Sequence, residues 1–118
     1  MEEFDYPEVI AKIKARFPQG TVKQREDNSR AYIPNQVYTD RVEAASDSRW
    51  DREFREVEIN LQQGYVKVIA RVTIGPHYRD GIGFATIADV DKAKQLPNKV
   101  DQAANEAIRE ALDTWQIG

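Results

Sequence analysis

The spacing of hydrophobic and polar residues predicts a helix near each end of the chain and a third helix between them. Asp5 and Glu8 have the spacing of a capping box, and Pro7 suits the first turn of a helix. Pro18 and Gly20 end this first helix, whose expected apolar positions are Val9, Ile10, Ile13 and Phe17. A second helix is expected from Pro34 and Asn35 to about Ser46, with its inward side formed by Val37, Tyr38, Val42 and Ala45.

Two short extended segments lie between these helices, at Thr21 to Arg25 and at Arg30 to Ile33. The residues that separate them, Glu26-Asp27-Asn28-Ser29, favour a turn. We therefore expect a basic β-hairpin that leads directly into the second helix.

Three strands are predicted in the second half of the chain. Val57, Ile59 and Leu61 alternate with polar residues, and a longer alternation runs from Val66 to Ile74. The third strand is expected from about Tyr78 to Ala88, with Ile82, Phe84 and Thr86 together on one side. The spacing of Gly81 and Gly83 indicates a bulge or a close approach between backbones.

The last helix shows the clearest period in the sequence and is expected to begin near Asn98. Its apolar stripe consists of Val100, Ala104, Ala107, Ile108, Ala111, Leu112 and Trp115. Such a stripe should lie across one face of an antiparallel three-stranded sheet, in a β-β-β-α core. The predicted order is α-β-β-α-β-β-β-α, and we expect residues 1–118 to form one α+β domain.

The opposite face of the sheet is expected to carry apolar residues as well, namely Phe54, Tyr65, Ile69, Ala85 and Ile87. One helix cannot cover both faces of a sheet. Either the first two helices cover the second face, or a neighbouring subunit does.

Composition narrows the class of protein. The chain has 118 residues with 17 basic and 20 acidic side chains, so its net charge of −3 provides no global attraction to nucleic acid. It has no cysteine, which excludes disulfides and thiolate metal sites. Its N-terminus is acidic, and its longest apolar run, Val68 to Ala70, is far too short to span a membrane. We expect a cytoplasmic protein, associated with the nucleoid if it is bacterial or comes from a phage.

The chemical groups give little indication of catalysis. His77 is the sole histidine and follows Gly75-Pro76 in a turn, and Asp89 and Asp91 are a pair of acids without further metal-ligand spacing. Glu56 and Glu58 point the same way from one strand and can be neutralised by Lys67 or Arg71 on the next. We therefore expect no enzyme, no metal and no cofactor.

Two groups of basic residues are candidates for binding phosphates. Six of them lie between positions 12 and 30, and three more lie just before the last predicted helix at Lys92, Lys94 and Lys99. Tyr32, Tyr38 and Tyr65 could offer stacking surfaces for bases. Ordinary solvated charge is the competing interpretation, because the acidic residues nearly cancel the basic ones.

Several blocks of the sequence, taken in order, resemble the Rad-fifty-two family of single-strand annealing proteins, from about Val9 onward. They are Arg30-Ala31-Tyr32-Ile33-Pro34, then Trp50 ahead of the first long strand, then Asp80-Gly81-Ile82-Gly83-Phe84, and finally the alanine-rich stretch 103–112 followed by Trp115. The resemblance implies a homo-oligomeric ring or arc that holds single-stranded DNA in an external basic groove during double-strand-break repair and homologous recombination. Its partners would be single-stranded DNA, further copies of the chain and other recombination proteins, and its mechanism needs no metal or nucleotide.

The resemblance also implies a set of DNA-binding residues. Arg109 matches a groove residue of the last helix directly, and Arg30 matches the exit of the hairpin. Weaker candidates, by location, are Lys23, Arg25, Lys67, Arg71, Lys92, Lys94 and Lys99. The family pattern places a Lys-Arg pair and a further Arg in the last helix, whereas Glu110 and Asp113 occupy two of these positions here. This change lowers the expected affinity or shifts the DNA path toward the hairpin and Lys92 and Lys94.

Two other interpretations fit parts of the sequence. From Pro34 onward the order α-β-β-β-α is also that of a double-stranded RNA-binding module, although the expected start of the last helix carries one Lys and one Asp where such modules are densely basic. The chain could equally be an oligomeric assembly domain with weak or lost DNA binding, which the acidic residues of the last helix would favour.

Overall fold

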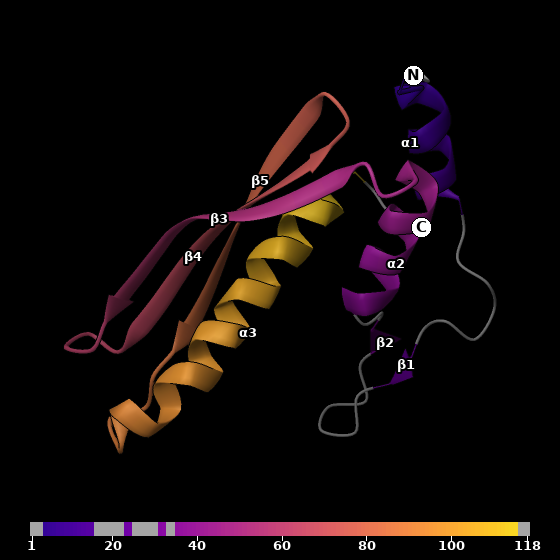
Figure 1. Ribbon diagram of the computed structural model, residues 1–118. Coiled ribbons are helices and arrows are strands. Elements are labelled where there is room, and N and C mark those ends of the chain that lie inside the picture. Colours follow the sequence, from indigo (N-terminus) through magenta and orange to yellow (C-terminus); the bar gives the residue numbers. More distant parts are fainter. Residues whose placement is uncertain (1–3, 16–22, 25–30, 33–34, 116–118) are drawn as a thin grey trace.

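The computed structural model describes residues 4–15, 23–24, 31–32 and 35–115, and its elements follow the predicted order (Figure 1). The helices are α1 (Tyr6–Lys14), α2 (Asn35–Ser46) and α3 (Lys92–Asp113). The strands are β1 (Lys23–Gln24), β2 (Ala31–Tyr32), β3 (Trp50–Asn60), β4 (Tyr65–Ile74) and β5 (His77–Thr86). The predicted α+β class is confirmed, with a long C-terminal helix packed on an antiparallel sheet.

α1 is fixed at both of its ends by side chains. The carboxylate of Asp5 accepts a hydrogen bond from the backbone N–H of Glu8 at 3.1 Å, which confirms the predicted N-terminal cap. At the other end, the Arg41 guanidinium of α2 donates to the carbonyl oxygens of Ile13 at 3.1 Å and Ala15 at 2.5 Å. Because these carbonyls have no partner within the helix, Arg41 both caps α1 and ties it to α2. Phe17, predicted for the same helix, lies outside the described residues.

The sheet has the strand order β3-β4-β5, with both pairs antiparallel. β3 begins at Trp50, earlier than the predicted start near Val57. The sequence shows no apolar–polar alternation in its first half, because three charged residues separate Trp50 from Phe54. The pairing of β3 with β4 shifts between Phe54 and Glu56, which leaves Arg55 as an extra residue. This bulge places Phe54 and Val57 on the same side of the sheet as the buried side of β4.

The buried and exposed sides of β5 are the reverse of those predicted. Gly81, Gly83 and Ala85 pair with buried residues of β4 and lie beneath α3, whereas Ile82, Phe84 and Thr86 point away from the helix. The prediction placed the large side chains inward because apolar residues usually mark the buried side of a strand. Here the buried positions are occupied by the smallest residues instead.

The reason is the close packing of α3 on β5. A Cβ atom added at Gly83 would collide with the carbonyl oxygen of Ala103 and lie 2.6 Å from the amide nitrogen of Ala107. One added at Gly81 would collide with the backbone of Ala107 and Ala111. Glycine on the strand and alanine on the helix therefore let the two backbones approach each other, which confirms the close approach predicted from the spacing of the two glycines.

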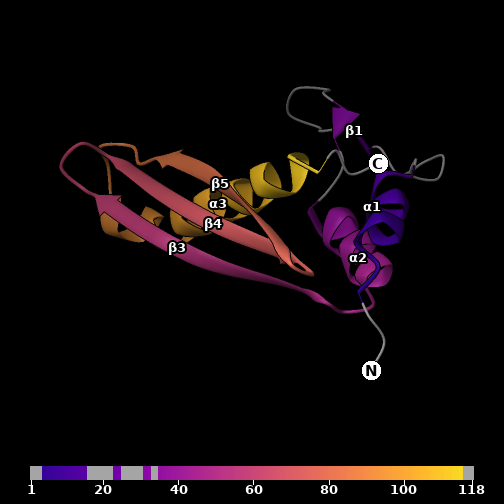
Figure 2. The same cartoon turned by 90° about the horizontal axis from the view of Figure 1, so that it is seen from above.

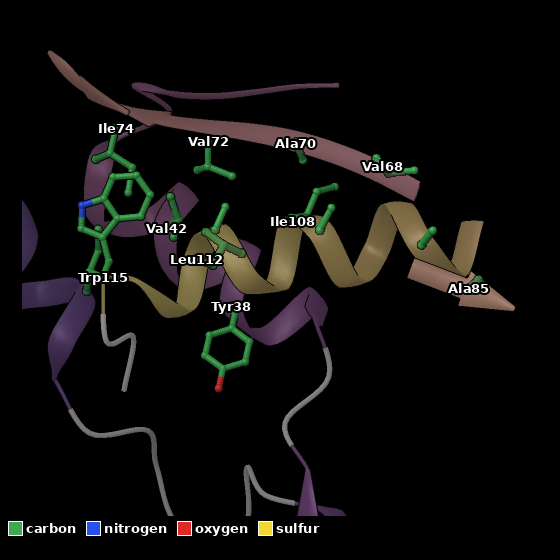
Figure 3. Packing of buried hydrophobic residues seen from close by; sticks show 14 of the residues in the cluster. Tyr38, Val42, Val68, Ala70, Val72, Ile74, Ala85, Ile108, Leu112 and Trp115 are labelled. Carbon is green, nitrogen blue, oxygen red and sulfur yellow. The ribbon is translucent and has the colours of Figure 1, made fainter. Parts of the chain in front are cut away.

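The core lies between α3 and the central strand (Figure 3). Every second residue of β4, from Val66 to Ile74, is fully buried, and Ile108 and Leu112 of α3 point at this row. The Trp115 side chain is 1% exposed, and its indole N–H donates to the hydroxyl oxygen of Tyr6 at 2.9 Å. Trp115, two residues after α3 ends, is in this way attached to α1.

α3 begins at Lys92, six residues before the predicted start near Asn98. Proline removes one backbone hydrogen bond inside a helix, so Pro97 does not favour a helix that extends on both sides of it. In the structure Pro97 lies within α3, and the Gln95 side chain holds the first turn by bonding to both the N–H and the carbonyl of Ala88. The basic residues Lys92 and Lys94 therefore belong to the helix.

α1 and α2 lie together beside the C-terminal end of α3 and the start of β3 (Figures 1 and 2). They do not cover the sheet face that points away from α3, which we call the outer face. Of the two alternatives that the sequence leaves open for this face, cover by the first two helices is therefore wrong for the single chain. Of the residues expected on this face, Tyr65 and Ile69 lie there, whereas Phe54, Ala85 and Ile87 lie on the side of the helix.

Candidate nucleic-acid interface

Arg109 lies at the junction of α2 and α3. Its guanidinium donates to the side-chain oxygen of Asn35 at 3.2 Å and to the hydroxyl of Tyr38 at 2.9 Å, and it lies 3.9 Å over the Tyr38 ring. Its Nε is 3.3 Å from a carboxylate oxygen of Asp113, one helical turn further along α3. The side chain keeps an exposed fraction of 29%. Arg109 therefore joins two helices while presenting part of its charge to solvent.

The same junction lies next to the base of the predicted hairpin. Lys23 and Gln24 of β1 pair antiparallel with Ala31 and Tyr32 of β2, as the sequence predicts. α2 starts at Asn35, three residues after β2 ends, and the Asn35 side chain also donates to the carbonyl of Asn105 on α3 at 2.9 Å. The fold thus anchors the start of α2, three residues after β2, beside Arg109. Of the hairpin candidates, Arg25, Arg30 and the side chain of Lys23 lie outside what the structure describes.

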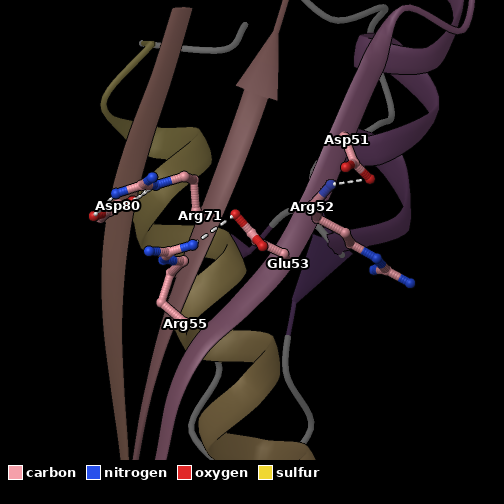
Figure 4. Close-up of polar contacts among 6 residues, drawn as sticks. All are labelled: Asp51, Arg52, Glu53, Arg55, Arg71 and Asp80. Atoms are coloured by element: carbon pink, nitrogen blue, oxygen red, sulfur yellow. Dashed lines mark hydrogen bonds and ion pairs between the residues drawn. The ribbon is translucent and has the colours of Figure 1, made fainter.

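Lys67 and Arg71 lie elsewhere, on the outer face of the sheet, and Figure 4 shows Arg71 there beside Asp80. The Arg71 guanidinium makes a bidentate ion pair with the Asp80 carboxylate, with N–O distances of 2.8 and 3.2 Å. It also lies 3.8 Å from the centre of the Tyr78 ring. Lys67 pairs with Glu56 at 2.9 Å, as expected from the cross-strand position. Hydrogen bonding to these carboxylates raises the pKa of both Lys67 and Arg71, and Arg71 lowers the pKa of Asp80.

The outer face is acidic as a whole. It carries five carboxylates, from Asp51, Glu53, Glu56, Glu58 and Asp80, against three cations, from Arg55, Lys67 and Arg71. The fold therefore separates Lys67 and Arg71 from Arg109 and surrounds them with negative charge. A DNA backbone would be repelled here more readily than attracted.

The third group of candidates lies in the N-terminal half of α3. Lys92 is 3.2 Å from Asp89 and donates to the carbonyl of Leu61 at 2.6 Å, so it fastens α3 to the β3–β4 turn. Lys94 is exposed, and Lys99 lies 3.5 Å from the side-chain oxygen of Gln102. With a rise of about 1.5 Å per residue, Lys99 is roughly 15 Å and Lys92 roughly 25 Å along the helix from Arg109.

The tyrosines proposed as stacking surfaces are engaged within the fold. Tyr38 is 6% exposed beneath Arg109, and Tyr65 donates to Glu58 at 2.8 Å. Among the described residues, two exposed aromatic side chains lie on the outer face instead, Tyr78 and Phe84, at 57% and 52%. Sequence reasoning missed them because it assigned β5 the opposite orientation.

The groups weighed for catalysis lie on different elements: Glu56 and Glu58 on β3, His77 at the start of β5, and Asp89 and Asp91 just before α3. His77 is exposed, with its ring 4.3 Å from that of Tyr6, centre to centre. Among residues 4–15, 23–24, 31–32 and 35–115, no group of three or more His, Asp or Glu is placed to hold a metal ion. In the same part of the chain, no helix is long and apolar enough to cross a lipid bilayer.

Comparison with known proteins assigns the chain to no family. No protein-family model matches the chain, and no curated protein matches it. The functional argument therefore depends on the residues and their arrangement.

Proposed function

We propose that this protein binds single-stranded DNA and anneals complementary strands in recombination and double-strand-break repair, acting as a homo-oligomer without catalysing a chemical step. The observation that carries the proposal is the link between Arg109 and Asn35, at 3.2 Å. This link supports the proposal because it joins Arg109 to the first residue of α2, three residues after the hairpin strand β2. The order of helix, hairpin, helix, sheet and closing helix is also that of the family which the sequence resembles.

The proposed DNA path follows the hairpin and the C-terminal half of α3. Arg109 would contact one phosphate with the exposed part of its guanidinium, and Lys23, Arg25 and Arg30 would contact others from the hairpin. Cations that hold only the backbone leave the bases free to pair, which is what annealing needs. Lys67 and Arg71 are weaker members of the proposed site because both are already paired with carboxylates.

Asp113 competes with the DNA in this arrangement. It holds the Nε of Arg109 at 3.3 Å, so a phosphate must displace or share an existing carboxylate partner. Each single copy therefore offers few cations. Side-by-side copies would multiply the contacts along one strand, because linked weak sites bind a common ligand more tightly than separate ones.

A charge change at Asp113 tests the proposed path. In Asp113→Arg the competing carboxylate is replaced by a cation, so we expect tighter binding of a fluorescent single-stranded oligonucleotide. One added phosphate contact should also steepen the slope of log affinity against log salt by about 0.7. Asp89→Arg makes the same charge change at the far end of α3 and is the matched control. Equal effects of the two variants would show that total charge, not this path, governs binding.

Two observations favour a second function. Arg109 contacts Asn35, Tyr38 and Asp113 of its own chain, and the outer face is acidic, which suits an assembly domain that has lost DNA binding. In that case Arg109→Gln would change stability but not DNA affinity.

Duplex RNA is included in the same titration, because preferential binding of duplex RNA by a monomer would favour the RNA-binding alternative.

A further inference from the structure

The exposed large hydrophobic side chains of the described chain gather in two places. Phe54, Val57, Ile59 and Leu61 are 43–50% exposed and follow the inner side of β3, where α3 does not reach. We call this row, with Arg52 at its start, the β3 strip. Tyr78, Ile82 and Phe84 are 41–57% exposed on the outer face. Val90, in the loop before α3, is the one large hydrophobic side chain in the exposed set of the described residues that belongs to neither place.

We propose that the β3 strip of one copy docks on the outer face of a second copy, at Ile69, Ile82 and Phe84. Ile69 and Ile82 are direct partners across β4 and β5, and Phe84 follows on the same side of β5. Together they form an apolar centre bordered by charge. This inference depends on the homo-oligomer in the proposed function, and it specifies the two surfaces that meet.

Charge complementarity supports this pairing of surfaces. The outer face has more carboxylates than cations, and Glu58 has no cation within ion-pair distance among the described residues. The β3 strip begins at Arg52, whose guanidinium has no hydrogen-bond or ion-pair partner in the described part of the chain and points away from the outer-face cluster (Figure 4). The strip therefore brings a cation and apolar side chains to a surface that has apolar side chains and excess negative charge.

Contacts between identical surfaces are less favourable. If two β3 strands paired edge to edge, the Glu53, Glu56 and Glu58 rows of both copies would face one another, and like charges across a ladder are destabilising. The exposed side of α3 is also a poor cover for the strip because it carries polar residues such as Asp101, Asn105 and Glu106.

The two surfaces lie on opposite sides of the sheet. A contact between them is therefore head to tail, and each added copy leaves a free strip at one end and a free outer face at the other. Such contacts continue into arcs or close into rings. Copies can follow one another in this way because the molecule is thin in one direction, measuring 52 × 33 × 17 Å along its principal axes.

Two single variants and their mixture test the inference by light-scattering mass. Val57→Glu disables the strip and Phe84→Glu disables the outer face, so each alone should be a monomer while the wild type is an oligomer. Mixed in equal amounts they should form a heterodimer and nothing larger, because one intact strip can meet one intact outer face. Val90→Glu is the control and should keep the wild-type mass. Both altered side chains are about half exposed, and unchanged thermal unfolding would show that the variants fold.

Three outcomes would overturn the inference. Wild-type mass for either single variant would show that its surface is not in the contact. A mixture that stays monomeric would indicate a contact between like surfaces. A monomeric wild type would remove both this inference and the oligomer of the proposed function, whereas an oligomer with the expected variant masses that binds no DNA would remove the proposed function alone.

Discussion

The Arg109 guanidinium lies 3.9 Å over the ring of Tyr38 and donates to its hydroxyl oxygen at 2.9 Å. One side chain of α3 thereby holds the start of α2, from which the basic hairpin projects. The same cation is the first candidate for a DNA contact in the proposed function, so stability and the proposed binding depend on one residue. This overlap makes Arg109 the residue at which the two roles must be separated by experiment.

We expect Arg109→Gln to lower the free energy of unfolding by about 1–2 kcal/mol, because it removes a cation–π contact and charge-assisted hydrogen bonds. Arg109→Lys keeps the charge but loses the planar fork, so it should recover DNA binding more fully than stability. Urea denaturation gives the first quantity and anisotropy with single-stranded DNA gives the second. Glu106→Gln removes one charge at an exposed position of the same helix and serves as the control for stability. Equal stability of Arg109→Gln and the wild type would contradict the structural role.

Gly83→Ala should destabilise the protein by about 1–3 kcal/mol, the usual cost of forcing an extra carbon into a packed core. The added Cβ would meet the backbone of Ala103 and Ala107, which cannot move aside as a flexible side chain can. Thermal unfolding measures the effect. Thr86→Ala, on the exposed side of the same strand, should stay within about 0.5 kcal/mol of the wild type. A neutral Gly83→Ala would mean that α3 lies further from β5 than the structure places it.

Tyr6→Phe should cost about 1–3 kcal/mol, because it leaves the buried indole N–H of Trp115 without its acceptor. The change removes one oxygen atom and leaves the ring contacts of Tyr6 in place. Chemical denaturation followed by tryptophan fluorescence provides the measurement. Tyr78→Phe removes an exposed hydroxyl and is the matched control. If the two variants are equally stable, this bond does not hold Trp115 to α1.

The ion pair of Arg71 with Asp80 predicts a dependence of stability on pH. Arg71 lowers the pKa of Asp80, so the folded state binds this proton less readily than the unfolded state does. The stabilisation is therefore complete above the ordinary aspartate pKa of about 4 and is lost as the pH falls through the lower folded-state value. The stability difference between the wild type and Asp80→Asn should accordingly shrink between pH 6 and pH 3. A difference that stays constant over this range would contradict the pairing.

The predictable part of the fold rests on periodicity. The stripe of α3, the alternation of β4 and the cap at Asp5 each repeat a local rule, and the structure follows all three. The orientation of β5 could not be predicted this way, because the rule that large apolar residues face inward fails where Gly81 and Gly83 make room for a helix backbone. The early start of α3 was missed because the support for its first turn comes from a Gln95 side chain reaching back to Ala88.

The candidate site was predictable in kind but not in arrangement. The sequence identifies Arg109 and the hairpin, yet only the fold brings Asn35 beside Arg109 across 74 positions. The sequence predicts that Lys67 can neutralise Glu56 on the neighbouring strand, but it does not predict that Asp80 of β5 is the partner of Arg71. Ion pairs between strands depend on register, and the bulge at Arg55 sets that register for β3.

Strand annealing itself is the most direct test of the central claim. Two complementary oligonucleotides carrying a donor and an acceptor fluorophore are mixed with the protein at low salt, and the rate of energy transfer is compared with the rate without protein. The account predicts faster pairing with the wild type, a further increase with Asp113→Arg and a smaller effect with Arg109→Gln. Pairing no faster than the spontaneous rate, under low-salt conditions that most favour phosphate contacts, would contradict the claim that this protein anneals DNA.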